Sequence, residues 1–177
     1  MDFLAKCLDA ALWHGPDGPK LGPIAQADID TLPRPLVFTN GVYDLLHPGH
    51  VQLLAQARGL GASLVLALNS DASVRTLEKG ADRPMCTLSD RMAVAGALKS
   101  VDRITWFESS TPLALILALH PDILVKGGDW PIDQIVGAKE VMAWGGQVHS
   151  IPFSLNRSTT QLIQKIRASS QPQDPQK

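Results

Sequence analysis

Two histidines set three residues apart, His47 and His50, are the residues of this sequence whose type and spacing most clearly suggest chemistry. They follow residues 39–44 (TNGVYD) and flank Pro48 and Gly49, and proline suits the first turn of a helix. The free N–H groups at a helix N-terminus and the helix dipole both favour an anion. Two imidazoles placed there can each donate a hydrogen bond to a phosphate oxygen and so stabilise charge that develops in a transition state.

The histidine pair also has two simpler interpretations. Two histidines three apart could bind a metal, but the chain offers no obvious third and fourth ligand. They could also be only capping residues of the helix. The two cysteines, Cys7 and Cys86, form no CxxC pattern and indicate reduced thiols in a cytoplasmic protein. We therefore expect no metal site in the chain.

The elements that must position the histidines form a regular alternation of strands and helices. Short apolar runs predict strands at residues 36–39, 63–68, 103–107, 123–125 and 147–151. Helices are predicted at residues 48–60, 71–78, from Ser89, from Thr111, at residues 137–144 and from Ser158 or Thr159. This α/β pattern predicts a Rossmann-like five-stranded parallel sheet with helices on both faces. Ligands of such sheets bind outside the carboxyl ends of the strands.

Two of the predicted helices have an apolar face that we expect to be buried against the sheet. The helix capped by Ser89 would bury Val94, Ala97, Leu98 and Val101. The helix capped by Thr111 would open with Pro112 and bury Leu113, Ile116 and Leu117.

The ends of the chain differ from this alternating core. Residues 1–34 are rich in glycine and proline and predict an N-terminal extension with short helices at 3–12 and 26–32. Residues 35–168 form the predicted domain, and the polar residues 169–177 predict a flexible tail. The first residues contain no basic segment ahead of an apolar one, so we expect no secretory signal.

Composition excludes several classes of partner. The 177 residues suffice for one domain with a sizeable core. Lys plus Arg number 16 and Asp plus Glu number 17, so the chain lacks the basic excess typical of nucleic-acid binders. No apolar run approaches the roughly 20 residues that span a bilayer. We therefore expect neither a nucleic-acid nor a membrane partner.

Residues 39–50 (TNGVYDLLHPGH) resemble the signature of the nucleotidyltransferase superfamily of cytidylyltransferases and adenylyltransferases. The succession of residues 125–130 (VKGGDW) and 157–160 (RSTT) is similar to the D-glycero-β-D-manno-heptose 1-phosphate adenylyltransferase group, which supplies ADP-heptose for the lipopolysaccharide inner core. The resemblance covers about residues 36–167. It implies an enzyme that converts ATP and heptose 1-phosphate to ADP-heptose and pyrophosphate.

The resemblance also implies roles for the residues that match the family's motifs. His47, His50 and Lys126 would be the catalytic groups at the reacting phosphates. The nucleotide would be bound by Thr39, Asn40, Gly41, Gly49, Gly127, Gly128, Asp129, Arg157, Ser158, Thr159 and Thr160. The acceptor substrate would be bound by Asp44, Asn69, Asp71, Lys79 and Arg91. The chain departs from the family at Tyr43, where phenylalanine is more common.

Several of these residues also have a structural alternative. Lys126 could be an exposed turn lysine, and residues 157–160 could be only a helix cap. Residues 69–71 could form the cap and first turn of a helix, Lys79 could be a solvated loop charge, and Arg91 could pair with a neighbouring carboxylate. Position favours the functional interpretation, because all these segments follow parallel strands or open the next helix, so one cleft could collect them.

The implied reaction needs no general base and no covalent nucleophile. The attacking phosphate monoester is mostly a dianion at pH 7, since its second pKa is about 6. The site needs positive charge, oriented donors and Mg²⁺ on the polyphosphate of ATP. Two alternatives stay open. One is a cytidylyltransferase for glycerol 3-phosphate or another small alcohol phosphate, and the other is a non-catalytic nucleotide-binding domain.

The resemblance implies partners as well as a reaction. Enzymes of this group are often fused to an N-terminal sugar kinase, and residues 1–34 are too few to hold one. We therefore expect a separate kinase to make the heptose 1-phosphate. Dimers are common in the family, so we also expect a homodimer.

Overall fold

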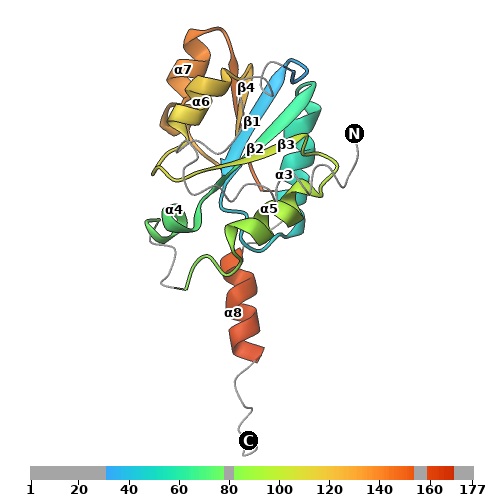
Figure 1. Ribbon diagram of the computed structural model, residues 1–177, viewed down its shortest axis with the longest axis vertical. Helices are drawn as coiled ribbons and strands as arrows, with labels where there is room; N and C mark the ends of the chain where they lie inside the picture. The colour runs from blue at the N-terminus through green and yellow to red at the C-terminus, as the bar shows by residue number, and fades with distance from the viewer. Residues whose placement is uncertain (1–30, 78–81, 154–158, 170–177) are drawn as a thin grey trace, which may run out of the picture.

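The computed structural model describes residues 31–77, 82–153 and 159–169, and its centre is a parallel sheet of order β3-β2-β1-β4-β5 (Figure 1). The strands are β1 (Leu36–Gly41), β2 (Ser63–Asn69), β3 (Arg103–Phe107), β4 (Ile123–Gly127) and β5 (Gln147–Ile151). This confirms the predicted five-stranded α/β fold. β1, β2 and β4 run one or two residues beyond their predicted carboxyl ends.

Both faces of the sheet are buried, which explains why its strands are continuous apolar runs. β1 lies at the centre, with Phe38 paired to Val65 of β2 and to Leu124 of β4. Val37 packs into one hydrophobic cluster, whereas Leu36 and Phe38 pack into the other. Successive side chains of a strand therefore serve opposite faces.

Each face is covered by a pair of helices. The first face carries α3 (Pro48–Gly59) and α5 (Leu88–Gly96), and the second carries α6 (Leu113–Leu119) and α7 (Ala138–Ala143). Two short elements, α4 (Asp71–Arg75) and the 3₁₀ helix η1 (Ile132–Gln134), follow β2 and β4. The last helix, α8 (Thr159–Ser169), projects away from the sheet (Figure 1). Within the described ranges, no helix is long and apolar enough to cross a membrane.

The predicted cap and apolar face of α5 were partly wrong. The N-cap is Thr87, whose hydroxyl accepts a hydrogen bond from the Asp90 backbone N–H, and not Ser89. A helix that starts earlier presents Met92 and Ala95 to the sheet and leaves Val94 55% exposed. Ala97 is also exposed, whereas Leu98 and Val101 pack against the core as predicted.

A similar correction applies to α6. Its N-cap is Pro112, which offers no side-chain cap, so Thr111 does not cap this helix. Ile116 is buried as predicted, but Leu115 and Leu119 complete the buried face and Leu117 is 51% exposed. In an almost uniformly apolar helix (LALILAL) the sequence cannot fix which face turns inward. The helix predicted at residues 3–12 lies outside the described residues, as do residues 26–30 of the helix predicted at 26–32. Residues 31 and 32 form a turn and a bend rather than the end of a helix.

Candidate active site

The loop between β1 and α3 turns sharply at the carboxyl edge of the sheet. Tyr43 adopts a positive φ of 49°, and its ring folds back over Gly41, where an added Cβ would lie 2.8 Å from Tyr43 Cε2. Position 41 therefore needs glycine. Tyr43 is 5% exposed, and burial raises the pKa of its phenol above the usual value, so the ring forms an uncharged floor for the site.

His47 and His50 lie at the start of α3 with their rings stacked, the centroids 3.8 Å apart and the planes at 25°. His47 occupies the N-cap position, but its side chain makes no capping hydrogen bond. The residue is 7% exposed, and its Nδ1 has no hydrogen-bond partner among the described residues. Burial lowers the pKa of His47 below its usual value. Its imidazole is therefore a neutral group at pH 7.

The two simpler interpretations of the histidine pair find no support in this geometry. The helix-cap interpretation requires a side-chain hydrogen bond that His47 does not make. The metal interpretation requires further ligands, and no three His, Cys, Asp or Glu side chains gather at one point in the part of the chain that the structure describes. Gly49 leaves room for the His47 ring, since an added Cβ would lie 3.1 Å from its Cε1 atom.

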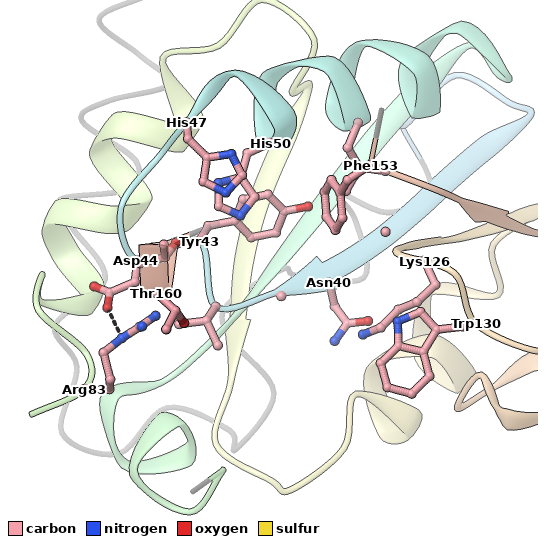
Figure 2. Close-up of a pocket in the computed structure, with 15 residues that line it drawn as sticks. Asn40, Tyr43, Asp44, His47, His50, Arg83, Lys126, Trp130, Phe153 and Thr160 are labelled. Carbon is pink, nitrogen blue, oxygen red and sulfur yellow. Dashed lines mark ion pairs between the residues drawn. The ribbon is translucent and has the colours of Figure 1, made fainter. Parts of the chain in front are cut away.

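The histidine rings face a cavity of about 460 Å³ at the carboxyl edge of the sheet (Figure 2). One end of the cavity carries Asp44, Arg83 and Thr160, the other carries Asn40, Lys126 and Trp130, and the two imidazoles lie between them. Thr159 and Thr160 come from the first turn of α8. The cavity thus has a cationic side chain at each end and a pair of imidazole donors in the middle.

A second cavity of about 340 Å³ adjoins the first and shares five lining residues with it: Asn40, Gly41, Val42, Lys126 and Trp130. The rest of its wall combines polar groups with apolar side chains of the neighbouring loops. The residues that line only the second cavity are Asn69, Leu77, Phe107, Ser110, Thr111, Pro112, Gln134, Ile135 and Val136. It therefore offers a less charged chamber beside the Lys126 end.

The end of β4 and the turn after it are packed so closely that both Gly127 and Gly128 have little room for a side chain. An added Cβ at Gly127 would lie 2.4 Å from Leu53 Cδ2, and Gly128 has a φ of 113° with Trp130 Nε1 2.8 Å from its Cβ position. The hydroxyl of Ser150 accepts a hydrogen bond from the Trp130 N–H and donates one to the Gly128 carbonyl. These contacts hold the indole between the two cavities.

Five of the eleven residues predicted to bind the nucleotide line the first cavity. Asn40, Gly41, Gly127, Thr159 and Thr160 do so. Four predicted contacts lie elsewhere. Thr39 is buried within β1, Gly49 lies against the His47 ring, and Gly128 and Asp129 belong to neither cavity wall. Arg157 and Ser158, and the predicted acceptor contact Lys79, lie outside the described residues.

Two of the predicted acceptor contacts serve the scaffold in this structure. Arg91 has a fully buried side chain that donates to the carbonyls of Val42 and Asn69 and pairs with Asp71 at 2.6 Å. Asp71 lies in the first turn of α4, behind its cap Ser70. The carboxylate pairing that the sequence allowed for Arg91 is therefore present, and neither residue lines either of the two cavities described above.

The cavity wall also contains residues that sequence reasoning did not assign. Arg83 is buried against Asp44, with Arg83 Nε 2.6 Å from Asp44 Oδ2, and the carboxylate also accepts the N–H groups of Met85 and Cys86. Phe153 lies at the wall beside His50, with ring centroids 6.4 Å apart. No spacing rule points to these residues, because they reach the cavity from separate loops.

An open parallel sheet with an anion-binding cavity at the carboxyl ends of its strands is the arrangement of nucleotide-binding α/β proteins. The model of the cytidylyltransferase-like family matches residues 38–165. The chain is 52% identical over 144 residues to the D-beta-D-heptose 1-phosphate adenylyltransferase of Bordetella bronchiseptica, which covers 81% of this chain and 89% of that protein.

Two further comparisons agree. The chain is 52% identical over 132 residues to the bifunctional protein HldE of Hahella chejuensis, in a match that covers 75% of this chain but 28% of that protein. The crystal structure of a lipopolysaccharide core biosynthesis protein from Thermoplasma volcanium matches with a TM-score of 0.55 and 26% identity, over 69% of this chain and 98% of that one. The chain thus belongs to the cytidylyltransferase-like family and, within it, to the group of the D-beta-D-heptose 1-phosphate adenylyltransferases. The family resemblance seen in its motifs is confirmed.

Proposed function

We propose that this protein transfers the adenylyl group of ATP to D-glycero-β-D-manno-heptose 1-phosphate, forming ADP-heptose and releasing pyrophosphate. One observation carries the proposal: the stacked pair His47–His50 lies midway along a cavity that has a cationic residue at each end. A direct displacement at phosphorus places the entering and leaving oxygens in line on opposite sides of the phosphorus atom. The cavity offers anion-binding groups on both sides of the imidazoles, as that geometry requires.

The imidazoles would act on the α-phosphate as hydrogen-bond donors. A neutral imidazole still carries one N–H, so the lowered pKa of His47 does not prevent donation. Such donors stabilise the charge that develops on the α-phosphate oxygens. The nucleophile is already a dianion, so no residue needs to accept a proton from it.

Magnesium enters this proposal with ATP, as part of the MgATP substrate. The described residues hold no cluster of metal-ligating side chains, and Asp44, the acidic residue of the cavity wall, is already paired with Arg83. The polyphosphate oxygens are suitable ligands for Mg²⁺, which keeps several waters and few protein contacts in such complexes. The ion would neutralise charge on the polyphosphate during transfer.

The second cavity would hold the sugar. It adjoins the Lys126 end of the first cavity, so a sugar placed there can present its 1-phosphate beside Lys126. Its hydroxyls can meet polar groups of the wall such as Asn69 and Thr111. A separate kinase would supply the heptose 1-phosphate, and a location in the cytoplasm would give access to ATP.

The proposal is tested by pyrophosphate release with defined substrate pairs. We expect ATP with heptose 1-phosphate to give pyrophosphate and ADP-heptose in equal amounts, and ATP alone to give neither. CTP with glycerol 3-phosphate is the matched alternative pair. Equal or faster turnover with that pair would refute the proposal, and no turnover with either pair would favour a non-catalytic nucleotide-binding domain.

A further inference from the structure

The buried ion pair between Asp44 and Arg83 lies in the wall of the first cavity. Arg83 is 7% exposed and Asp44 is 4% exposed, with Arg83 Nε 2.6 Å from Asp44 Oδ2. The carboxylate is held in turn by the backbone N–H groups of Met85 and Cys86, each 2.9 Å away. The position of the guanidinium is therefore fixed from one side.

Only one side of the Arg83 guanidinium is used by this pair. The Nε atom faces Asp44, while the structure gives no hydrogen bond from the two terminal NH₂ groups to any residue it describes. Arg83 lines the cavity, and Thr160 appears at the same end of it in Figure 2. The Nε atom is buried against Asp44, and the two terminal NH₂ groups are left to the cavity, where an anion can accept hydrogen bonds from both of them.

The surroundings of Arg83 favour a phosphate as that anion. Thr159 and Thr160 contribute to the same wall from the first turn of α8, an eleven-residue helix whose dipole favours negative charge at this end. The two terminal NH₂ groups of arginine form a fork that matches two oxygens of a phosphate. Asp44 is the acidic side chain of this wall, and Arg83 already neutralises it.

The layout of the cavity indicates whether Arg83 would bind the phosphate of the sugar or the phosphates that leave ATP. Lys126 lies at the opposite end of the cavity from Arg83 (Figure 2). Lys126 also lines the second cavity, which is large enough for a sugar. If the sugar phosphate enters at the Lys126 end, in-line transfer requires the leaving group to depart toward Arg83.

We propose that Arg83 binds the β- and γ-phosphates of ATP and the pyrophosphate that leaves, and that Asp44 is the positioning residue that holds Arg83 there. The inference rests on the proposed adenylyl transfer, and it gives Asp44 a role different from the acceptor contact expected from sequence. Asp44 does not touch the sugar, because its carboxylate is occupied by Arg83 and by two backbone N–H groups.

The test compares three variants with a matched ion pair elsewhere in the molecule. Arg83→Gln removes the guanidinium with its charge and its paired donors, and Arg83→Lys keeps the charge but not the paired donors. Asp44→Asn removes the carboxylate that positions Arg83. Arg58→Gln is the control, because Arg58 Nε also lies 2.6 Å from an aspartate oxygen, that of Asp102, outside both cavity walls.

For Arg83→Gln we expect the KM for ATP and the inhibition constant of pyrophosphate to rise by about 10–100-fold, the effect of one charge-assisted contact. The KM for heptose 1-phosphate should change by less than about twofold. Arg83→Lys should recover part of the loss, because lysine keeps the charge without the fork. Asp44→Asn should raise the pyrophosphate constant less than Arg83→Gln does, and Arg58→Gln should leave it unchanged.

A rise confined to the KM for heptose 1-phosphate in Arg83→Gln would overturn the inference, as would an unchanged pyrophosphate constant. Calorimetric titration of pyrophosphate into each folded variant gives the same comparison without turnover. If Arg83→Gln does not fold, the double variant Asp44→Asn with Arg83→Gln removes both buried charges and serves in its place. Failure of the proposed function is distinguishable, since the unmodified protein would then form no ADP-heptose.

Discussion

Each edge of the sheet carries an aspartate that pairs with an arginine and accepts backbone N–H groups, but the two ion pairs have different surroundings. At the edge where the strands begin, Asp102 accepts the Leu64 N–H at 2.9 Å and pairs with Arg58 at 2.6 Å. At the edge where the strands end, Asp44 accepts two backbone N–H groups and pairs with Arg83 at the same distance. The local chemistry of the two pairs is alike.

The difference lies in what remains for the arginine to bind. Arg58 also donates to the Gly61 carbonyl, and its side chain is 34% exposed to solvent, so its donors are satisfied. Arg83 is buried and turns its terminal donors to a cavity. An arginine in an ion pair therefore indicates a functional site when its side chain is buried, lines a cavity and has N–H donors without a partner in the protein.

A stacked pair of aromatic rings also occurs at both edges of the sheet, and the two pairs differ in their surroundings. His120 stacks on Trp144 with centroids 4.0 Å apart and planes at 25°, almost the geometry of His47 on His50. His120, however, is exposed and follows the carboxyl end of α6. His120 and Trp144 also line a cavity, of about 310 Å³, so stacked rings beside a cavity do not by themselves make a phosphate site. What distinguishes the histidine pair is its place at the N-terminus of a helix, which favours an anion.

The largest effect should follow from the loss of Arg91. We expect Arg91→Ala to reduce the free energy of unfolding by about 3–5 kcal/mol, because it leaves the buried carbonyls of Val42 and Asn69 and the Asp71 carboxylate without their donor. Chemical denaturation measures this change. A stable variant with a raised KM for the sugar phosphate would restore Arg91 to substrate binding.

The next effect separates the two stacked pairs. We expect His50→Ala to lower kcat by about 10²–10³-fold, the usual cost of one transition-state donor, with the fold intact. His120→Ala should leave kcat within about twofold. Steady-state rates and thermal melting of both variants check this. Near-normal kcat in His50→Ala would mean that the two pairs are equivalent and that neither acts in catalysis.

The smallest effect is a flat pH profile. Because burial lowers the pKa of His47, the imidazole is already neutral above pH 7 and has no proton to lose there. We expect log kcat/KM to rise up to about pH 6, the second pKa of the sugar phosphate, to level off as the dianion comes to predominate, and then to stay level to about pH 9. A steep fall between about pH 7 and 9 would instead require an imidazolium in the working enzyme.

The strands could be predicted from sequence because each is a short apolar run that ends at turn residues. Such continuous apolar runs are typical of strands that are buried on both faces of a parallel sheet. Helix faces were less predictable. Val94 and Leu117 are apolar yet exposed, since the rotation of a short helix depends on where its cap forms. Thr87 and Ser89 are both acceptable caps, and only the Asp90 N–H contact distinguishes them.

The candidate site was predictable where one local motif builds it and unpredictable where distant loops meet. His47, His50 and Lys126 stand in contiguous motifs beside strand ends, and all three line the cavity. The Asp44–Arg83 pair joins two loops 39 positions apart. The sequence shows that both residues are charged, but it does not show that they are in contact. Asp44 was therefore assigned to the substrate when its nearest cation belongs to the protein.

The central claim is that the entering and leaving phosphates lie on opposite sides of the histidine pair, and the stereochemistry at the α-phosphorus tests it most directly. ATP carrying a sulfur of defined configuration on that atom would be converted with heptose 1-phosphate, and the configuration of the product would be read by phosphorus NMR. A single in-line displacement predicts inversion. Retention would require two displacements through an adenylylated residue and would contradict the account.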